Sequence, residues 1–112
     1  MIDWKRVEEL QTEIGADGFA EVAEMFLEEA EQTVQTLLSG PEPGDIEGQL
    51  HFLKGSALNL GLADLAAICQ DGERLAAAGH GATVDTSAVA AVYRVSRGAL
   101  LDGLAAALRP AD

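Results

Sequence analysis

The stretch DIEGQLHFLKGSALNLGLADLAAIC, residues 45–69, decides the fold because it holds two helical patterns separated by one glycine, Gly61. The first pattern is an apolar stripe at the spacing of an α-helix, formed by Ile46, Leu50, Leu53, Ala57 and Leu60. We predict a helix from Asp45, which can cap it, to Leu60. The second pattern predicts a helix over residues 62–78, with Leu65, Cys69 and Ala76 on its apolar stripe.

The rest of the chain carries similar patterns. A short helix is expected from Asp3, its N-cap, to Ile14, and Gly15 closes it. Longer helices are expected over residues 17–39 and 86–108, with inner stripes formed by Phe19, Val22, Phe26, Ala30, Val34 and Leu37 in the former and by Val89, Val92, Ser96, Leu100, Gly103 and Ala107 in the latter. All three prolines are expected outside helices. Short connections between long amphipathic helices imply antiparallel neighbours, so the predicted fold is all-α: an antiparallel up-down four-helix bundle with a short additional N-terminal helix packed across it.

The composition supports this fold. A length of 112 residues suits one domain, so residues 1–112 are expected to form a single helical domain. Apolar residues make up 48% of the chain but aromatic residues only 4%, so the core must consist mainly of Leu, Val, Ile and Ala. Such a core suits packed helices better than a sheet.

The charge and the termini exclude several classes of function. The formal net charge of −12 repels nucleic acid and anionic membrane surfaces. The amino terminus MIDWKRVEEL lacks the pattern of a signal peptide, and no stretch approaches the roughly 18 apolar residues that span a bilayer. The single cysteine, Cys69, cannot form an internal disulfide or a cysteine-rich zinc site, so we expect a cytoplasmic protein without a metal site.

The 45–60 helix has an unusual outer face. The side opposite its apolar stripe gathers Gly48, His51, Phe52, Gly55, Leu58 and Asn59. Lys54 lies on the flank, at i+3 from His51. Glycine inside a helix costs about 1 kcal/mol relative to alanine. Gly55 has a functional explanation, because a side chain one turn from His51 would occupy the space that a reacting group needs.

These residues suit phosphoryl transfer. An exposed neutral imidazole is a competent nucleophile near pH 7, because a reference pKa of about 6.5 leaves a free lone pair on most molecules. A phosphoryl group on His51 would add negative charge to an acidic protein, and Lys54, about 5–6 Å away, would offset that charge. Phosphoryl transfer needs mainly positioning and charge stabilisation, which a rigid helix with one cation supplies in part. A partner would have to supply the rest.

The segment HFLKGSALNLGLADLAAIC, residues 51–69, resembles the signature of histidine-containing phosphotransfer domains, the relay modules of multistep two-component signalling. After the histidine come a lysine, a glycine and a small polar residue at the family's spacings, then Leu-Gly and a cysteine in the following helix. The resemblance implies that His51 accepts a phosphoryl group from a receiver-domain aspartate and passes it reversibly to another receiver. It assigns Lys54 as the charge partner and Gly55 as steric clearance, whereas Ser56 is expected to be structural.

The resemblance also implies the partners, which are receiver domains of response regulators and hybrid histidine kinases. The receiver brings the divalent metal, so no cofactor is expected in this chain. The candidate receiver-docking surface comprises Gly48, Phe52, Leu58, Asn59, Leu62 and Glu73, although Phe52, Leu58 and Leu62 could equally be peripheral packing. Some relatives place a glutamine where this chain has Glu73. A carboxylate there cannot donate a hydrogen bond to a phosphoryl oxygen and could instead hold Lys54.

Simpler interpretations of individual residues exist. Lys54 could be an ordinary surface lysine paired with Glu47 or Asp64, and Gly55 could serve close helix packing. We expect Cys69 to be a small core residue. His80 lies between two glycines and is expected to be a solvated turn residue.

The sequence also bears on other functions. The alternative function is a helical module that binds receiver domains without transferring phosphate. A di-metal carboxylate bundle is excluded because neither histidine belongs to a Glu-x-x-His pair. Autonomous kinase activity is excluded because the sequence has no phosphate-binding glycine loop, so we expect a phosphoryl carrier and not a kinase. The chain resembles a freestanding module, although a domain excised from a hybrid kinase would look the same.

Overall fold

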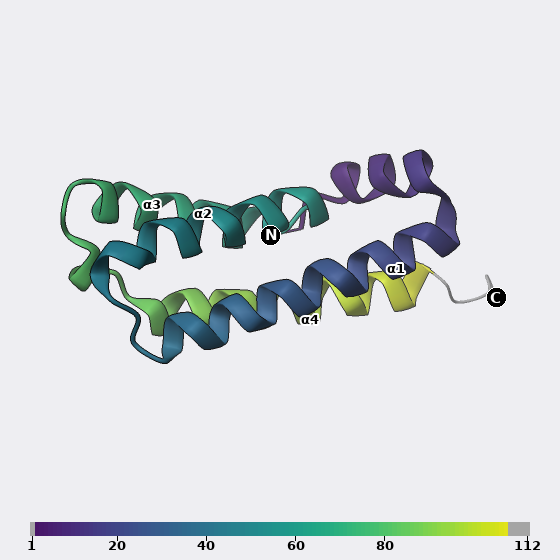
Figure 1. The fold of residues 1–112 in the computed structure, drawn as a ribbon. Coiled ribbons are helices and arrows are strands. Elements are labelled where there is room, and N and C mark those ends of the chain that lie inside the picture. The colour runs from purple at the N-terminus through teal and green to yellow at the C-terminus, as the bar shows by residue number, and fades with distance from the viewer. Residues whose placement is uncertain (1, 108–112) are drawn as a thin grey trace.

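The computed structural model describes residues 2–107, which form α-helices arranged in two layers (Figure 1). The helices are α1 (Trp4–Leu38), α2 (Pro43–Leu60), α3 (Ala63–Ala77) and α4 (Thr86–Ala107), with a 3₁₀ turn, η1 (Gly81–Thr83), before α4. One layer contains α2 and α3, and the other contains α1 and α4. Both α1 and α3 pack against α2 and α4, so successive helices are neighbours around the bundle. The predicted all-α bundle is confirmed, and Leu108, the expected end of the last helix, lies outside the described residues.

A sharp kink at Gly15 divides α1 into the short and the long helix that the sequence predicts. Gly15 has φ 78° and ψ 164°, outside the helical region. Glycine adopts these angles without strain, whereas other residues do not. The short segment begins directly after Asp3, whose Oδ1 accepts a hydrogen bond from the backbone N–H of Arg6 at 3.2 Å. Asp3 is therefore the N-cap, as predicted.

The start of α2 differs from the prediction. The helix begins at Pro43, two residues before the expected cap Asp45, and Glu42 is its N-cap residue. Proline suits a first helical turn, because its fixed φ is helical and its missing N–H would have no helical partner there. The expectation that every proline lies outside a helix is therefore wrong for Pro43. Asp45 falls within the first turn, where its negative charge interacts favourably with the helix dipole.

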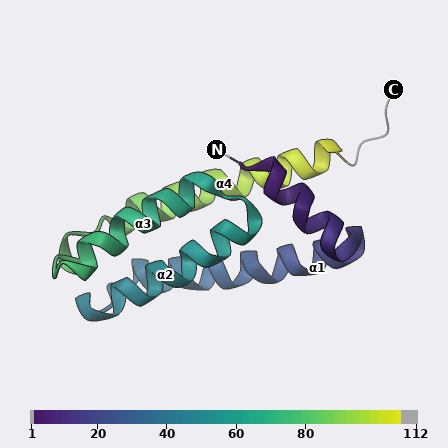
Figure 2. The same ribbon diagram turned by 90° about the horizontal axis from the view of Figure 1, so that it is seen from above.

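The short segment of α1 packs across one end of the bundle, as Figure 2 shows for the purple helix. The backbone N–H of Asp3 donates a hydrogen bond to the carbonyl of Gly61 at 2.7 Å. Gly61 ends α2 with φ 74°, and a Cβ there would lie 2.6 Å from the Asp3 oxygen, so the turn requires glycine for two reasons. On α4, the indole of Trp4 covers Gly103, where a Cβ would overlap the ring. The segment thus holds the α2–α3 turn against α4.

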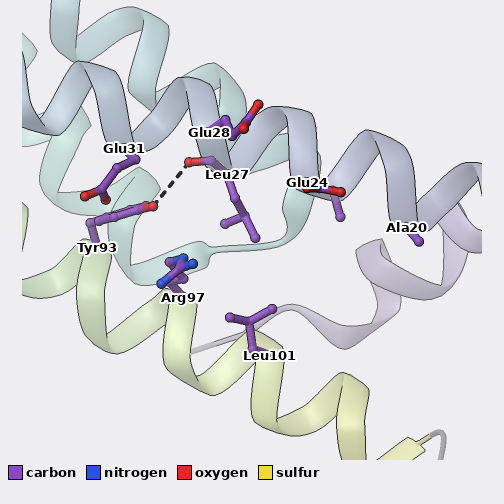
Figure 3. A pocket seen from close by; sticks show the side chains of 9 residues that line it. Ala20, Glu24, Leu27, Glu28, Glu31, Tyr93, Arg97 and Leu101 are labelled. Carbon is purple, nitrogen blue, oxygen red and sulfur yellow. Dashed lines mark hydrogen bonds between the residues drawn. The ribbon is translucent and has the colours of Figure 1, made fainter.

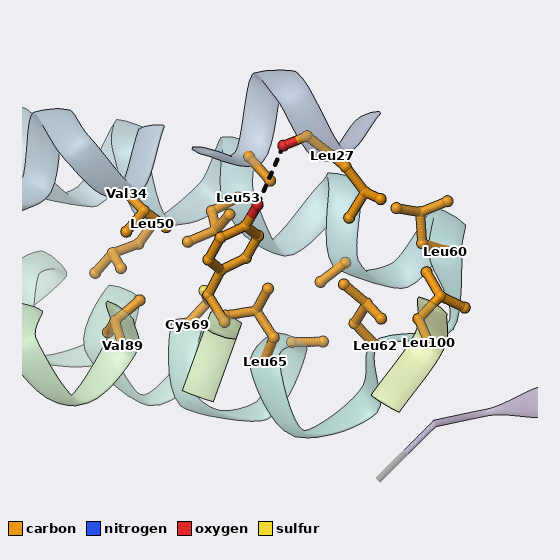
Figure 4. Close-up of a cluster of buried hydrophobic side chains, with 14 of the residues drawn as sticks. Leu27, Val34, Leu50, Leu53, Leu60, Leu62, Leu65, Cys69, Val89 and Leu100 are labelled. Carbon is orange, nitrogen blue, oxygen red and sulfur yellow. Dashed lines mark hydrogen bonds between the residues drawn. The ribbon is translucent and has the colours of Figure 1, made fainter. Parts of the chain in front are cut away.

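The core lies between the two layers and consists mainly of aliphatic side chains (Figure 4). The apolar stripe predicted for α2 is buried along its whole length. It meets buried residues of the other helices, among them Leu27, Val34, Leu65, Cys69, Val89 and Leu100. Tyr93 of α4 is also in the core, although the predicted apolar stripe did not include it. It is 1% exposed, and its hydroxyl donates a hydrogen bond to the Leu27 carbonyl at 3.2 Å. Within residues 2–107, no helix is both long and apolar enough to cross a membrane.

Candidate functional site

His51 stands on the outer face of α2 beside α3. Its side chain is 74% exposed, and its Nδ1 lies 3.3 Å from Oε2 of Glu73 on α3. A carboxylate oxygen only accepts hydrogen bonds, so this contact is favourable when Nδ1 carries the ring proton. In the neutral ring, Nε2 then carries the lone pair on the side away from Glu73.

Lys54 contacts the same carboxylate from the next turn of α2. Its Nζ lies 3.2 Å from Oε2 and 3.0 Å from Oε1 of Glu73. The side chains are only 22% and 16% exposed, respectively. Among the described residues, Glu73 Oε1 has no well-aligned hydrogen-bond donor, so the nearby ammonium group is what offsets the burial of this oxygen. The sequence-based suggestion that Glu73 holds Lys54 is confirmed.

The backbone on either side of His51 is bare. A Cβ added at Gly48 or at Gly55 would meet none of the described atoms within 4 Å. Close helix packing is therefore not the reason for Gly55, and that alternative is wrong. The open surface leaves the imidazole accessible to a large partner.

The residues of this site lie within a segment that matches a known family. Residues 21–110 match the family model of the Hpt domain, and this range includes α2, α3 and the three contacting side chains. The chain belongs to the Hpt domain family. Hpt domains have a phosphotransfer role in the phosphorelays of two-component signalling, and this role extends to the present Hpt domain. The short segment before Gly15 lies outside the match, and no curated protein or solved structure matches the chain.

Some of the residues predicted to form a receiver-docking surface of this Hpt domain are exposed, and others are not. Phe52 is 49% exposed and Leu58 is 56% exposed, which are high values for large apolar side chains. Asn59 is half-buried, and its amide donates a hydrogen bond to the Gly55 carbonyl at 3.0 Å. Its side-chain oxygen accepts a hydrogen bond from Nη2 of Arg6 at 3.4 Å. Arg6 was not predicted as a neighbour of the site, because its position depends on how the amino-terminal segment crosses the bundle (Figure 2).

Leu62 is buried and not available to a partner, so its prediction as a docking residue is wrong. It is 1% exposed and lies in the hydrophobic core. Its backbone forms an isolated antiparallel bridge with Ile2, so the start of the chain lies against it. The helical pattern around Leu62 cannot reveal this burial, since the covering residue is distant in the sequence.

Cys69 is buried close to the site and is 0% exposed. Burial and, to a lesser extent, the Glu73 carboxylate raise the pKa of its thiol to about 12, while Lys54 acts in the opposite direction. The expectation of a small core residue is confirmed, and a protonated thiol is a poor nucleophile. Ser56 is also buried, whereas His80 is exposed in the turn before η1. The described residues contain no group of three or more His, Cys, Asp or Glu side chains arranged to hold a metal ion.

Proposed function

We propose that His51 accepts a phosphoryl group from the phosphoaspartate of one receiver domain and passes it, reversibly, to the aspartate of another. The contact between Nδ1 and Glu73 supports this most directly, because it occurs on an imidazole that is 74% exposed. With the proton on Nδ1, Nε2 is the free nucleophile. The family membership supports the same role.

The bond changes in each transfer are simple. The lone pair of Nε2 forms the N–P bond, and the P–O bond to the receiver's aspartate breaks and returns its electron pair to the aspartate carboxylate. The ring keeps its Nδ1 proton, so positive charge develops on the imidazole during the attack. The Glu73 carboxylate, 3.3 Å from Nδ1, stabilises this charge. Transfer to the second receiver reverses the same bond changes.

Lys54 and the two glycines complete the proposal. Lys54 lies one turn from His51 and would offset the negative charge of a bound phosphoryl group. Gly48 and Gly55 leave the space through which a receiver's aspartate approaches. Phe52 and Leu58 would contribute apolar contacts to the docked receiver. We further propose that the divalent metal belongs to the receiver, and that this chain has neither a cofactor nor kinase activity of its own.

The test is phosphoryl transfer from a panel of phosphorylated receiver domains to the full chain. The variant His51→Gln removes the nucleophile at an exposed position, so folding should be unchanged. The matched control is His80→Gln, because His80 is also exposed and its side chain caps no helix. We expect an acid-labile label on wild type and His80→Gln and none on His51→Gln.

Two results would contradict the proposal. Label that persists on His51→Gln would remove His51 as the acceptor. Receiver binding without any label on wild type would favour the alternative, a helical module that binds receivers without exchanging phosphate.

A further inference from the structure

A groove of about 500 Å³ lies between α1 and α4 (Figure 3). It opens on the layer of α1 and α4, whereas His51 lies on the opposite layer of α2 and α3. The proposed phosphotransfer site does not use it. Its two walls come from helices that are distant in sequence, so the groove exists only in the folded bundle.

One wall of the groove is acidic. Glu24, Glu28 and Glu31 line it at i, i+4 and i+7 along α1. Within the described residues, none of the three forms an ion pair, and Glu31 accepts a hydrogen bond from the uncharged amide of Gln35 at 3.3 Å. Like charges one turn apart destabilise a helix, so this row is unfavourable in the free protein. Cations with the same spacing would remove the repulsion.

The floor of the groove is mainly apolar. Ala23 and Leu27 line it from α1, and Leu101, which is 41% exposed, lines it from α4. Tyr93 lies at the bottom with its hydroxyl bonded to the Leu27 carbonyl, as the dashed line in Figure 3 shows. Burial, followed by the nearby Glu31, raises the pKa of Tyr93 to about 12, so the phenol stays neutral at physiological pH. The floor therefore offers apolar contact, and the charged groups lie on the walls.

We propose that this groove docks a basic amphipathic helix of another protein, whose lysines or arginines at i, i+4 and i+7 pair with Glu24, Glu28 and Glu31. The apolar side of that helix contacts the floor. From Ala20 to Glu31 the acidic wall spans about three turns, or roughly 17 Å, which is enough for a short recognition helix. Glu24 and Glu31 lie about 10 Å apart along the axis of α1, so the row of carboxylates suits an elongated partner such as a helix better than a compact cation.

Arg97 restricts which helices fit. It lies on the wall opposite the carboxylates and forms no ion pair within the described part of the chain. It can bind an acidic side chain on the other flank of the partner helix and repels a helix that is basic all round. A second copy of this chain is a poor occupant, because each copy has a net charge of −12. A helix docked here leaves His51 accessible on the other layer.

The test uses a synthetic amphipathic peptide with lysines at i, i+4 and i+7, a Leu/Ala ridge and one glutamate on the opposite flank. A control peptide has the same composition, with its lysines spread around the helix. Fluorescence anisotropy measures the binding of each peptide to the full chain. The groove variant combines Glu24→Gln, Glu28→Gln and Glu31→Gln. The matched variant combines Glu8→Gln, Glu13→Gln and Glu47→Gln, which remove the same charge from exposed positions outside the groove.

We expect wild type and the matched variant to bind the patterned peptide equally. The groove variant should bind about tenfold more weakly, because three exposed ion pairs each contribute a few-fold in affinity. Peptide-induced amide shifts in NMR spectra should lie on α1 and α4.

The proposal would be overturned by absence of binding, by equal binding of the two peptides, or by equal losses in the two variants, since the last two results indicate non-specific charge attraction. Shifts centred on α2 would also overturn it. A dimer of wild type that the groove substitutions abolish would assign the groove to a second copy instead.

Discussion

Replacing Glu73 with glutamine isolates the contribution of its charge to transfer. Glu73→Gln keeps the shape of the side chain and an oxygen that can accept the Nδ1 proton of His51, but it removes a negative charge 3.3 Å from Nδ1. At that distance, the attraction between a carboxylate and the positive charge on the phosphorylated imidazole ring is about 1.3 kcal/mol at the dielectric constant of bulk water. The water value is a lower limit, because the His51 side chain is 74% exposed but that of Glu73 is only 16% exposed. Transfer should therefore be about tenfold slower in the variant.

A rapid-quench assay at saturating receiver separates this effect on chemistry from an effect on docking. Asp71→Asn is the matched control, because it removes one charge from the same helix at a side chain that is 72% exposed. We expect Asp71→Asn to transfer at the wild-type rate. Equal rates for wild type and Glu73→Gln would refute the reasoning. An equal loss in Asp71→Asn would show that net charge matters and that the contact with His51 does not.

Three further predictions concern neighbouring residues. Lys54→Ala should slow transfer and lower the free energy of unfolding by about 1 kcal/mol, because the largely buried Glu73 loses its cation; an unchanged transfer rate would remove Lys54 from the mechanism. Gly55→Ala should raise the free energy of unfolding by up to about 1 kcal/mol yet slow transfer, whereas Gly98→Ala, which is equally open, should give the same gain in denaturant titrations with no effect on transfer. Cys69 should resist alkylation at about pH 8 until the protein unfolds, because a pKa of about 12 keeps the folded thiol protonated, and rapid labelling of the native protein would contradict this. Since the folded pKa is raised, the stability that this thiol contributes should be lost as the pH rises from about 9 to about 12.

The arrangement on α2 could be predicted because it depends on one helix. The helical period alone places His51 and Gly55 on one face and Lys54 on its flank. The contact of Lys54 with Glu73 joins two helices, so the period of one helix cannot predict it. It could be predicted from the spacing between His51 and Glu73, which corresponds to that of the family motif. Short-range rules therefore account for most of the candidate site.

The features that were missed depend on packing between distant segments. The helical periodicity around Leu62 is compatible with an exposed position, but the start of the chain lies against this residue and buries it. Arg6 reaches Asn59 only because the kink at Gly15 turns the first segment across the bundle. The hydrogen bond from Tyr93 on α4 to the Leu27 carbonyl on α1 depends on how closely the two helices approach. The periodicity of either helix alone does not determine that distance. The early start of α2 at Pro43 is a local error, caused by treating proline only as a helix breaker.

The contacts of Asp3 with Gly61 and of Trp4 with Gly103 bear on how this domain should be produced as a recombinant fragment. Trimming the protein to residues 21–110, the range that matches the family model, would retain His51 and its charged neighbours. It would also remove the short segment of α1, which holds the α2–α3 turn against α4, and Leu62 would become accessible to water. A fragment that keeps the native bundle should therefore include Ile2, which lies well before residue 21, where the match to the family model begins.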